Sequence, residues 1–475
     1  MKSLIFQKKS LILILLIFFA IASAGLYKSH NNKTQLCKNC SLIIISVDTL
    51  RADHTGIYGY SKNTTPNLDK WAKDAVVFTN MRTQIPATYP SFAIFLTGLS
   101  AFDLKIYNNL GIINGQLLEG GHPLDNSTVT LTEILRKNGY TTAAFIASPV
   151  LKPSATNLNK GFDTYYVNVA GSGESKSYNV IQQSLDWIDK NKNKKIFLWI
   201  HLLEPHAPYL PNKEYSCRFN SESCDLINQK TDEEIQSEIE KLSGCKEIPE
   251  DKLKFYESLY DAEIAMADNF IGQIINKLND FGLNNNSLTV FYGDHGEGMD
   301  HNFHFLHSHE LYDSHTKIPF IIKYPHSKGI KIDVPLQNTQ IFNTLLDVSE
   351  INYPDENKLS FEESLYGRFK AKLPEKYLYY VNTNLSKYSA QLGDYKYIYS
   401  LSGSCLFNNQ RDELYNLNKD PAETSNLIET EPAIFEKLKK QLLSYLRTLG
   451  LPKPLIKLKT EPQNKLLEEF KSLGY

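Results

Sequence analysis

Residues 41–47, with the sequence SLIIISV, form a run of mostly apolar, β-branched side chains that ends at Asp48. A short run with no polar face predicts a strand that is buried on both sides, as in a parallel sheet. An acidic residue at the carboxyl end of such a strand occupies the edge where open α/β sheets bind their ligands. The same residue can instead cap the segment that follows, so position alone leaves both roles open.

Similar stretches recur along the chain and alternate with helical patterns. Strands are expected at 141–147, 195–203, 287–292 and 319–324. Helices are expected from Pro66, at 130–137 and at 253–281. Strands that alternate with helices predict an α/β fold with a large, mostly parallel sheet flanked by helices.

The pattern changes after about residue 335. The segment 377–401 carries the aromatic-rich strand patterns YLYYVN and YKYIYS, ELY at 413–415 adds a third, and a helical stretch follows at 432–449. We therefore expect a main domain at 41–335, interrupted by a polar surface insertion at about 212–252. Residues 336–475 are expected to form a smaller α+β domain with an antiparallel sheet.

The composition narrows the classes of function. Of 475 residues, 42% are hydrophobic and 22% are charged, which is typical of folded globular proteins and excludes wholesale disorder. The formal net charge of −2 lacks the basic excess of a nucleic-acid binder, so no nucleic-acid partner is expected. Six cysteines are too few for a fold built on disulfides.

The cysteine spacing predicts one local bridge, between Cys217 and Cys224. Cys37 and Cys40 form a CKNC pair, but they precede a strand, whereas a thioredoxin-like redox pair follows one and begins a helix. The pairing of the remaining cysteines stays open.

The N-terminal segment 1–26 has a basic start followed by an apolar run, with small residues at Ala22-Ser23-Ala24. This pattern is typical of a signal peptide, and the run is also close to the length of a membrane anchor. A buried N-terminal helix is the alternative. Either of the first two readings places the rest of the chain outside the cytoplasm, in the periplasm or the extracellular space, with membrane association through this segment if it is retained.

A second acidic residue follows a predicted strand at GDHGEG, residues 293–298. Asp294 and His295 would lie at the same edge of the sheet as Asp48. Two carboxylates and an imidazole suit a divalent metal ion, namely calcium, magnesium, manganese or zinc. A polar surface turn is the alternative for the Asp-His pair taken alone.

Thr88 precedes Tyr89-Pro90-Ser91 and the apolar run FAIFL. Proline in the first turn predicts that a helix begins at this threonine, a position that favours anions. A nearby metal would lower the pKa of the hydroxyl and make it a nucleophile. An ordinary N-cap threonine is the alternative.

Histidines gather near the predicted strand ends. His206 follows the strand at 195–203, and five more stand within a short stretch after the DHG sequence: His301, His304, His307, His309 and His315. Imidazoles bind metals, contact oxyanions or protonate leaving groups. We expect at least three of the histidines to belong to an ordinary polar loop.

A series of motifs follows in a fixed order: VDTLRADHTGIYGY, PATYPSFAIFLTGL, HLLEPHAPY, GDHGEG, HSHELYD and DELYNLNKDPAETSNL. This series resembles the sulfatase family of the alkaline phosphatase superfamily over most of the chain. The resemblance implies a large α/β domain followed by a smaller domain with an antiparallel sheet.

The resemblance also implies roles for single residues. Asp48, Asp294 and His295 match the metal ligands, and Thr88 stands where the family has its nucleophile, itself a metal ligand. His206 and His307 match the histidines that contact the anionic group or the leaving oxygen. Arg51 and Asp53 match a segment that supports the site.

The chain departs from the sulfatase pattern at the nucleophile. Sulfatases carry Cys or Ser in a CxPxR-type signature and oxidise it to formylglycine, whereas Thr88 and Phe92 replace the modifiable residue and the arginine here. Oxidation of threonine would give a ketone, so the aldehyde-hydrate mechanism of formylglycine is not available to this residue. The tandem aspartates of many sulfatases are also reduced to Asp48-Thr49.

These observations predict an exported, metal-dependent hydrolase that cleaves phosphate or sulfate esters. A phospho(di)ester substrate and a covalent Thr88 intermediate are favoured, and the ester would belong to a glycan or a lipid head group. Three alternatives stay open: an arylsulfatase-like sulfuric ester hydrolase acting on sulfated glycans, a membrane-anchored phosphoethanolamine or glycerophosphate transferase, and a non-catalytic binding protein.

Overall fold

The computed structural model describes residues 37–451, apart from residue 38 and the segments 110–111, 114–115, 118–120, 169–176, 221–223, 225–229, 352–375 and 402–411. The segment 1–26, expected to be a signal peptide or an anchor, lies outside the described residues. Among the described helices, none combines the length and the apolar character needed to cross a membrane.

An eight-stranded sheet forms the centre of the molecule, in the order β14-β2-β13-β10-β1-β8-β6-β7. Its strands are β1 (Ser41–Val47), β2 (Val76–Phe78), β6 (Thr141–Ile146), β7 (Thr164–Val167), β8 (Ile196–Leu202), β10 (Ser287–Gly293), β13 (Phe320–Lys323) and β14 (Ile330–Ile332). β7, β6, β8, β1 and β10 run parallel, and only β13 is reversed against its neighbours in this sheet. The prediction of an α/β fold with a mostly parallel sheet is confirmed.

β1 occupies the middle of the sheet because its side chains can be buried on both faces. Ile43, Ile45 and Val47 point into one hydrophobic core, and Leu42 and Ile44 point into the other. This alternation follows from the two-residue period of a strand. β1 pairs in parallel with β10 on one side and with β8 on the other, so the carboxyl ends of the three strands meet at one edge.

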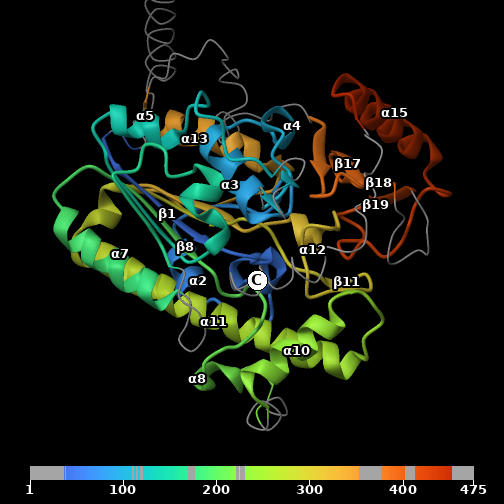
Figure 1. Ribbon diagram of the computed structural model, residues 1–475, viewed down its shortest axis with the longest axis horizontal. Coiled ribbons are helices and arrows are strands. Elements are labelled where there is room, and N and C mark those ends of the chain that lie inside the picture. Colours follow the sequence, from blue (N-terminus) through green and yellow to red (C-terminus); the bar gives the residue numbers. More distant parts are fainter. Residues whose placement is uncertain are drawn as a thin grey trace, which may run out of the picture.

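Two layers of helices cover the sheet (Figure 1). α2 (Pro66–Ala72), α7 (Tyr178–Asn191) and α11 (Glu250–Asp280) pack on the face of Ile43, and α3 (Thr88–Thr97), α5 (Leu131–Lys137) and α13 (Ile341–Val348) pack on the face of Leu42. The helices predicted from Pro66, at 130–137 and at 253–281 are α2, α5 and α11. α13 lies beyond residue 335 and still packs on the large sheet.

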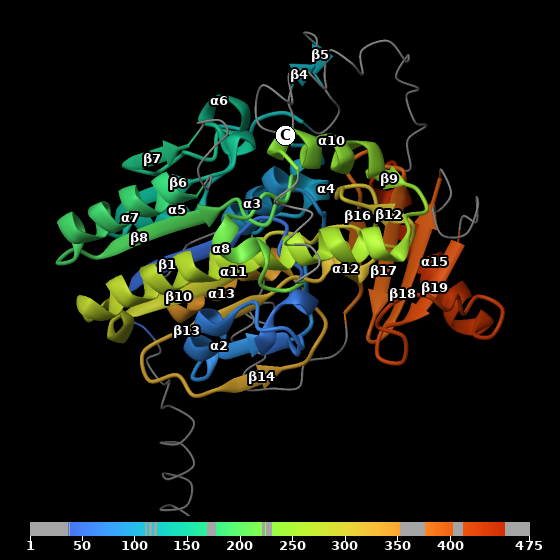
Figure 2. The ribbon, with the colours of Figure 1, turned by 90° about the horizontal axis from the view of Figure 1, so that it is seen from below.

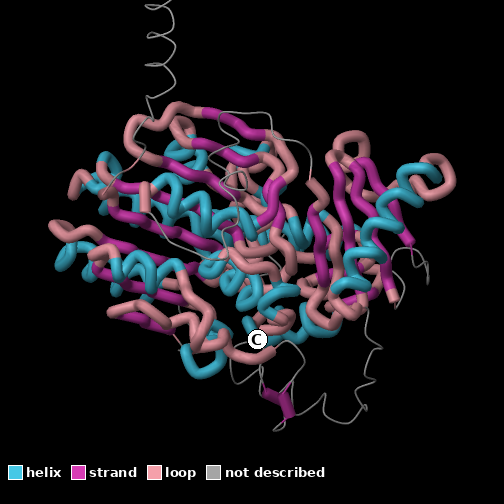
Figure 3. The backbone as a smooth tube through the Cα atoms, turned by 90° about the horizontal axis from the view of Figure 1, so that it is seen from above, coloured by secondary structure: helices cyan, strands magenta, loops and turns pink. Residues whose placement is uncertain are grey.

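A second, antiparallel sheet stands beside the first (Figures 2 and 3). It has the order β16-β17-β18-β19 and is covered by α15 (Pro432–Thr448). The strands are β16 (Leu378–Val381), β17 (Lys387–Leu392), β18 (Tyr395–Ser400) and β19 (Asp412–Asn416). The predicted smaller unit with an antiparallel sheet and a C-terminal helix is confirmed.

Sequence patterns missed β17, which has the sequence KYSAQL. Tyr388 and Ala390 are buried in a hydrophobic core, but they alternate with Lys387, Ser389 and Gln391, which are buried on the opposite face, so the strand has no continuous apolar run of the kind on which the prediction relied. Polar side chains are tolerated there because partners satisfy them: Gln391, for instance, accepts a 2.7 Å hydrogen bond from the hydroxyl of Tyr380.

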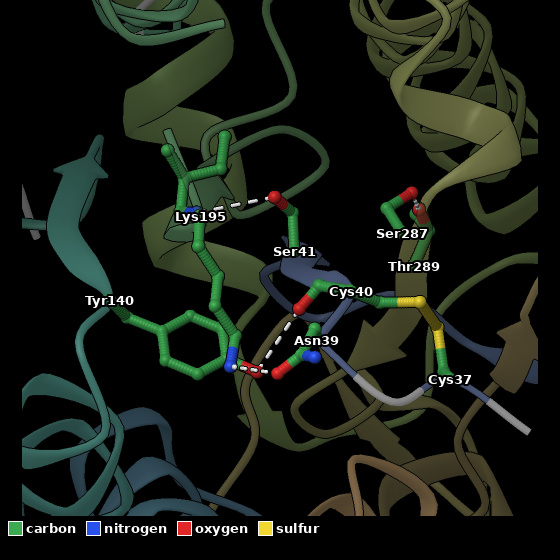
Figure 4. The surroundings of a disulfide bond; sticks show 9 residues. Cys37, Asn39, Cys40, Ser41, Tyr140, Lys195, Ser287 and Thr289 are labelled. Atoms are coloured by element: carbon green, nitrogen blue, oxygen red, sulfur yellow. Dashed lines mark hydrogen bonds between the residues drawn. A yellow bond between two sulfur atoms is a disulfide. The ribbon is translucent and has the colours of Figure 1, made fainter. Parts of the chain in front are cut away.

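A disulfide joins Cys37 and Cys40 directly before β1 (Figure 4). The carbonyl of Cys40 accepts a 3.0 Å hydrogen bond from the hydroxyl of Tyr140, and the ammonium of Lys195 lies 4.1 Å from the centre of the same ring. The disulfide and these contacts therefore fix the chain directly before β1.

The surface insertion at 212–252 contains α8 (Lys213–Ser216), α10 (Asp232–Leu242) and β9 (Gly244–Cys245). The predicted bridge between Cys217 and Cys224 is confirmed. Cys245 is also disulfide-bonded, and Cys405 lies outside the described residues. β9 pairs with β12 (Phe303–His304), so the insertion contacts the histidine-rich segment.

Shorter elements complete the described chain. They are β3 (Met81–Arg82), α4 (Ala101–Leu104), β4 (Ile112–Ile113), β5 (Gln116–Leu117), α6 (Pro153–Thr156), β11 (Met299–Asp300), α12 (Asp313–Thr316) and β15 (Leu336–Gln337).

The chain segment that follows Asp48 is tied to the long helix α11 through the buried carboxylate of Asp261. His54 Nδ1 lies 2.8 Å from one oxygen of Asp261, and Tyr60 and Lys62 donate to the other at 2.8 and 2.7 Å. Three contacts to one buried carboxylate fix the path of this segment over the edge of the sheet.

Replacing Asp261 by Asn should lower the free energy of unfolding by about 2–4 kcal/mol, because the buried hydrogen bonds lose their charge. Burial alone would raise the pKa of Asp261, but His54 and Lys62 hold it below its ordinary value of 3.8. A lowered folded-state pKa stabilises the fold fully above about pH 4, and this contribution is lost as the pH falls through the folded-state pKa. Urea unfolding of the wild type and of Asp261→Asn should show a difference in the free energy of unfolding at about pH 7 that disappears at about pH 2. A difference of equal size at both pH values contradicts this account.

Candidate active site

The two acidic residues predicted from the strand ends lie side by side. Asp48 follows β1 and Asp294 follows β10, and both are fully buried. Thr49 adopts a positive φ of 51°, an uncommon conformation for a β-branched residue, and its amide donates to Asp294 Oδ1 at 3.1 Å. Tyr260 of α11 donates to the carbonyl of Thr49 at 2.7 Å. The turn after β1 is therefore held against the carboxylate of the neighbouring strand.

Thr88 is the first residue of α3, where the sequence placed it, and it faces the same edge of the sheet. Its Oγ1 lies 3.3 Å from Nε2 of His295. Nδ1 of this imidazole lies 2.9 Å from the carbonyl of Gly296, which can only accept, so Nδ1 carries the proton and Nε2 presents a lone pair. Burial, followed by the nearby His307, lowers the pKa of His295 to about 3, which keeps the ring neutral.

The donor set suits a divalent metal ion. Nε2 of His295 lies 3.6 Å from Asp48 Oδ1 and 3.7 Å from Asp294 Oδ2. Both oxygens of Asp48 and Oδ2 of Asp294 are buried without a hydrogen-bond partner. Burial and the charge of Asp48 raise the pKa of Asp294 well above its ordinary value. A cation between the groups would remove this repulsion, so the predicted ligands Asp48, Asp294 and His295, with Thr88, fit such an ion.

A further buried histidine, His201, belongs to this cluster and was missed by the sequence analysis. It lies on β8, and its Nε2 is 3.5 Å from Asp48 Oδ2. One ligand atom each from Asp48, His201 and Asp294 lie within 4.8 Å of one another. The signal was present in the sequence as a lone histidine within the apolar strand IFLWIHL, but only the pairing of β8 with β1 brings it to Asp48.

His206 and His307 lie beside the cluster, as the sequence predicted. The ring of His307 lies 4.5 Å from that of His295 and 5.1 Å from that of His206. Glu297, to which the sequence analysis gave no role, places Oε1 3.4 Å from Nδ1 of His307. Burial disfavours the charged ring, but Glu297 outweighs it and raises the pKa of His307. A protonated His307 can donate to an oxyanion or to a leaving oxygen.

Other histidines of the crowded segment have separate structural partners. His301 lies 2.7 Å from Asp300 and stacks on Tyr312, and His309 faces the carbonyl of His307 at 2.9 Å. His304 lies on β12. His309 is exposed and fits the expectation of a solvated polar loop, whereas His301 is held by Asp300 and Tyr312 and His304 is buried on a strand, so the expectation of at least three loop histidines is wrong for these two.

Arg51 and Asp53 support the edge of the site. The guanidinium of Arg51 donates to both oxygens of Asp53, at 3.0 and 2.8 Å, and lies 3.2 Å from Asp300. Its NH1 also donates to the carbonyl of Glu297 at 3.4 Å. Arg51 therefore links the segment after β1 to the segment after β10.

The smaller sheet holds the segment that carries His307. Lys387 of β17 reaches both oxygens of the buried Glu310, at 2.7 and 2.5 Å. Lys396 of β18 donates to the carbonyl of Leu311 at 3.0 Å and lies 2.9 Å from Asp313. Near its start, this segment contacts the loop before Thr88, because Ser308 donates to the carbonyl of Pro86 at 3.0 Å.

Comparisons with known proteins agree with this arrangement. Residues 41–351 match the family model described as Sulfatase, and residues 301–449 match the model described as N-sulphoglucosamine sulphohydrolase, C-terminal. An arylsulfatase of Clostridium perfringens is 25% identical over 476 aligned positions, which cover 86% of this chain and 93% of that protein.

Solved structures share the fold. A protein in complex with its substrate D-glucosamine-2-N,6-O-disulfate superposes with a TM-score of 0.68 at 18% identity, covering 88% of this chain and 100% of that chain. The phosphonate monoester hydrolase of Agrobacterium radiobacter superposes with a TM-score of 0.62 at 17% identity, covering 86% of this chain and 96% of that chain.

Removing the ammonium of Lys387, as in Lys387→Met, should lower the free energy of unfolding by about 3–5 kcal/mol, because the buried carboxylate of Glu310 loses its cationic partner. The double variant Lys387→Met with Glu310→Leu should regain most of this loss, since no uncompensated charge remains. Chemical unfolding of the single and double variants measures both effects.

Lys439→Met is the matched control in the same domain. Its partner is Asp412, at 3.1 Å, and both side chains are partly exposed, so the loss should be below about 1 kcal/mol. Equal losses for Lys387→Met and Lys439→Met would refute a special role of the buried pair.

Proposed function

Because this chain belongs to the sulfatase family, we propose that it is a metal-dependent ester hydrolase in which Thr88 acts as the nucleophile and phosphodiesters are the preferred substrates. Asp48, Asp294, His295 and Thr88 hold the divalent ion, and His206 and His307 serve the leaving group. One observation carries the proposal: the Thr88 hydroxyl lies 3.3 Å from the unprotonated Nε2 of His295, beside three buried carboxylate oxygens without a hydrogen-bond partner, both of Asp48 and Oδ2 of Asp294.

The threonine lies where a nucleophile is useful. It begins a ten-residue helix, and the positive end of the helix dipole at this residue favours an anionic ester. Phe92, at the position of the signature arginine, is packed in the core against Trp199, with ring centres 4.6 Å apart. The chain therefore lacks the signature that leads to formylglycine and retains a hydroxyl at the reacting position.

The reaction takes place in two displacements. When bound, the divalent ion supplies positive charge to the hydroxyl and to the ester oxygens. Thr88 Oγ1 loses its proton to solvent and forms a bond to phosphorus while the bond from phosphorus to the leaving oxygen breaks, and His206 or His307 gives a proton to that oxygen. Water then attacks the phosphothreonine in line with Oγ1, and the same histidine takes the proton of the water. The Thr88 oxygen leaves and takes up a proton from solvent, which restores the hydroxyl.

The charges around the site favour an ester with one negative charge. Four buried cations of the described residues are already engaged with carboxylates: Arg51, Arg82, Lys387 and Lys396. Among the described residues next to Thr88, the protonated His307 remains to face the substrate, together with the metal when it is bound. A phosphodiester or a sulfate ester carries a single negative charge, so it matches this small number of positive charges better than a dianionic phosphate monoester.

Sulfate esters are the second candidate substrate. Its support is the family itself, since the relative in Clostridium perfringens is an arylsulfatase and a solved neighbour binds a disulfated glucosamine. The phosphonate monoester hydrolase supports the phosphorus chemistry in the same way. We further propose, from residues 1–26, that the enzyme is exported and acts on esters of glycans or lipid head groups outside the cytoplasm.

Thr88→Ala should reduce turnover by about 10³-fold or more, because the variant has no hydroxyl to form the covalent ester. The panel is bis(4-nitrophenyl) phosphate, 4-nitrophenyl phosphate and 4-nitrophenyl sulfate, with the diester expected to be cleaved fastest. Mass spectrometry of acid-quenched wild-type enzyme should find the phosphoryl or sulfuryl group on the peptide that contains Thr88.

Thr97→Ala is the matched control, since Thr97 ends the same helix and donates only to the carbonyl of Ala93. It should keep wild-type turnover. Undiminished turnover of Thr88→Ala would remove this residue from the nucleophile role. Fastest cleavage of the sulfate ester would leave the nucleophile intact and favour the second substrate class.

A further inference from the structure

We propose that His201 is a direct ligand of the metal ion held by Asp48 and Asp294, and that it makes the site select a transition-metal cation such as Mn²⁺ over Ca²⁺. The inference rests on the proposed metal-dependent function and deepens it, because it assigns a ligand and a class of metal to the site.

The placement of His201 follows from the sheet. β8 runs parallel to β1, and His201 is the register partner of Ser46, two residues before Asp48. The imidazole is fully buried, and its Nε2 lies 3.5 Å from Asp48 Oδ2. Ligands bound to one ion at about 2.0–2.6 Å lie no more than about 5 Å apart. The 4.8 Å limit within which atoms of Asp48, His201 and Asp294 converge satisfies this condition.

The hydrogen bonds of Ser46 are compatible with a lone pair on Nε2 of His201. The Ser46 hydroxyl accepts from the indole N–H of Trp199 at 2.9 Å, and its single proton can go to the carbonyl of Ile200 at 3.3 Å or to Nδ1 of His201 at 3.0 Å. When Ser46 donates to Ile200, Nδ1 donates to Ser46 and Nε2 presents a lone pair toward Asp48. The proposed ligand is this tautomer.

A lone pair that faces a carboxylate is repulsive unless a cation lies between them. Nε2 of His201 and both oxygens of Asp48 are buried without a hydrogen-bond partner. The 3.5 Å separation exceeds the usual length of an N–H···O bond, so a direct hydrogen bond does not account for the arrangement. A metal ion satisfies the nitrogen and the carboxylate oxygens together.

The surroundings hold the ring in this orientation. The ring centres of Phe92 and His201 lie 4.9 Å apart in an edge-to-face arrangement. Phe92 stands where the sulfatase signature has arginine, so no cationic side chain competes for the carboxylates on this side. The imidazole is confined between an aromatic ring and Ser46, with Nε2 turned to the site.

A second nitrogen ligand changes the choice of metal. Calcium and magnesium prefer oxygen ligands, imidazole suits zinc, copper, iron and nickel, and Mn²⁺ is a transition-metal cation that also accepts carboxylate oxygens, so a mixed set of imidazoles and carboxylates fits it. With His295 and His201 the site offers two imidazole nitrogens and two carboxylates. We therefore expect Mn²⁺ to displace Ca²⁺ from the protein.

Pulsed electron paramagnetic resonance of the full chain loaded with Mn²⁺ tests the proposal, because it counts the nitrogens bound to the ion. Wild-type protein should show two imidazole nitrogen couplings, and His201→Gln should show one. The same substitution should weaken Mn²⁺ binding by about 10-fold or more and affect Ca²⁺ binding less, as measured by calorimetry.

His304→Gln is the matched control, since His304 is a buried histidine on β12 and should leave both couplings in place. Bound Mn²⁺ with a single nitrogen in the wild-type protein would overturn the role of His201 while leaving the proposed function standing. Absence of any divalent ion binding would overturn both. The wild-type spectrum alone separates these results if His201→Gln does not fold.

Discussion

The parallel pairing of β1 with β8 and β10 is the constraint on which the site depends. Parallel strands end at the same edge, so Asp48 and Asp294 are brought together away from water, with His201 beside them. Burial and the repulsion between these two carboxylates raise the pKa of Asp294. The hydrophobic cores on both faces of the sheet hold the strands in register against this repulsion, and a divalent cation would turn it into attraction.

The smaller sheet also helps to position the residues of the candidate site. Buried lysines from two of its strands hold the segment that carries His307, and Ser308 ties this segment to the loop before Thr88. Ion pairs buried to this degree contribute little net stability, but each is costly to break from one side. They therefore act mainly by fixing where the segment lies, so the second sheet sets the distance between the histidine and the threonine.

Two residues that depart from the sulfatase signature, Thr88 and Phe92, lie one turn apart in α3. Thr88 provides a hydroxyl in place of the modifiable residue, and Phe92 fills the arginine position with a ring that packs against Trp199 and His201. An aromatic side chain here adds apolar contact beside the buried His201 where the signature has a charge. The fold of the family is thus kept, while two residues in the first turns of α3 differ from the signature.

The sequence by itself determined the class of fold and most of the candidate site. Continuous apolar strands, the acidic residues directly after them and the proline in the first turn of α3 are local signals, and they led to Asp48, Thr88, Asp294 and His295. The antiparallel second sheet was also visible, except for β17, whose buried polar residues conceal it.

Only the tertiary structure decided the roles of His201, Glu297 and Lys387. His201 and Lys387 are polar residues whose partners, Asp48 and Glu310, lie far along the chain. Glu297 stands within a recognised motif, yet its contact with His307 depends on how the following loop folds back. Local patterns report which face of an element is buried, whereas the pairing of strands and the docking of the second sheet determine which polar groups meet there.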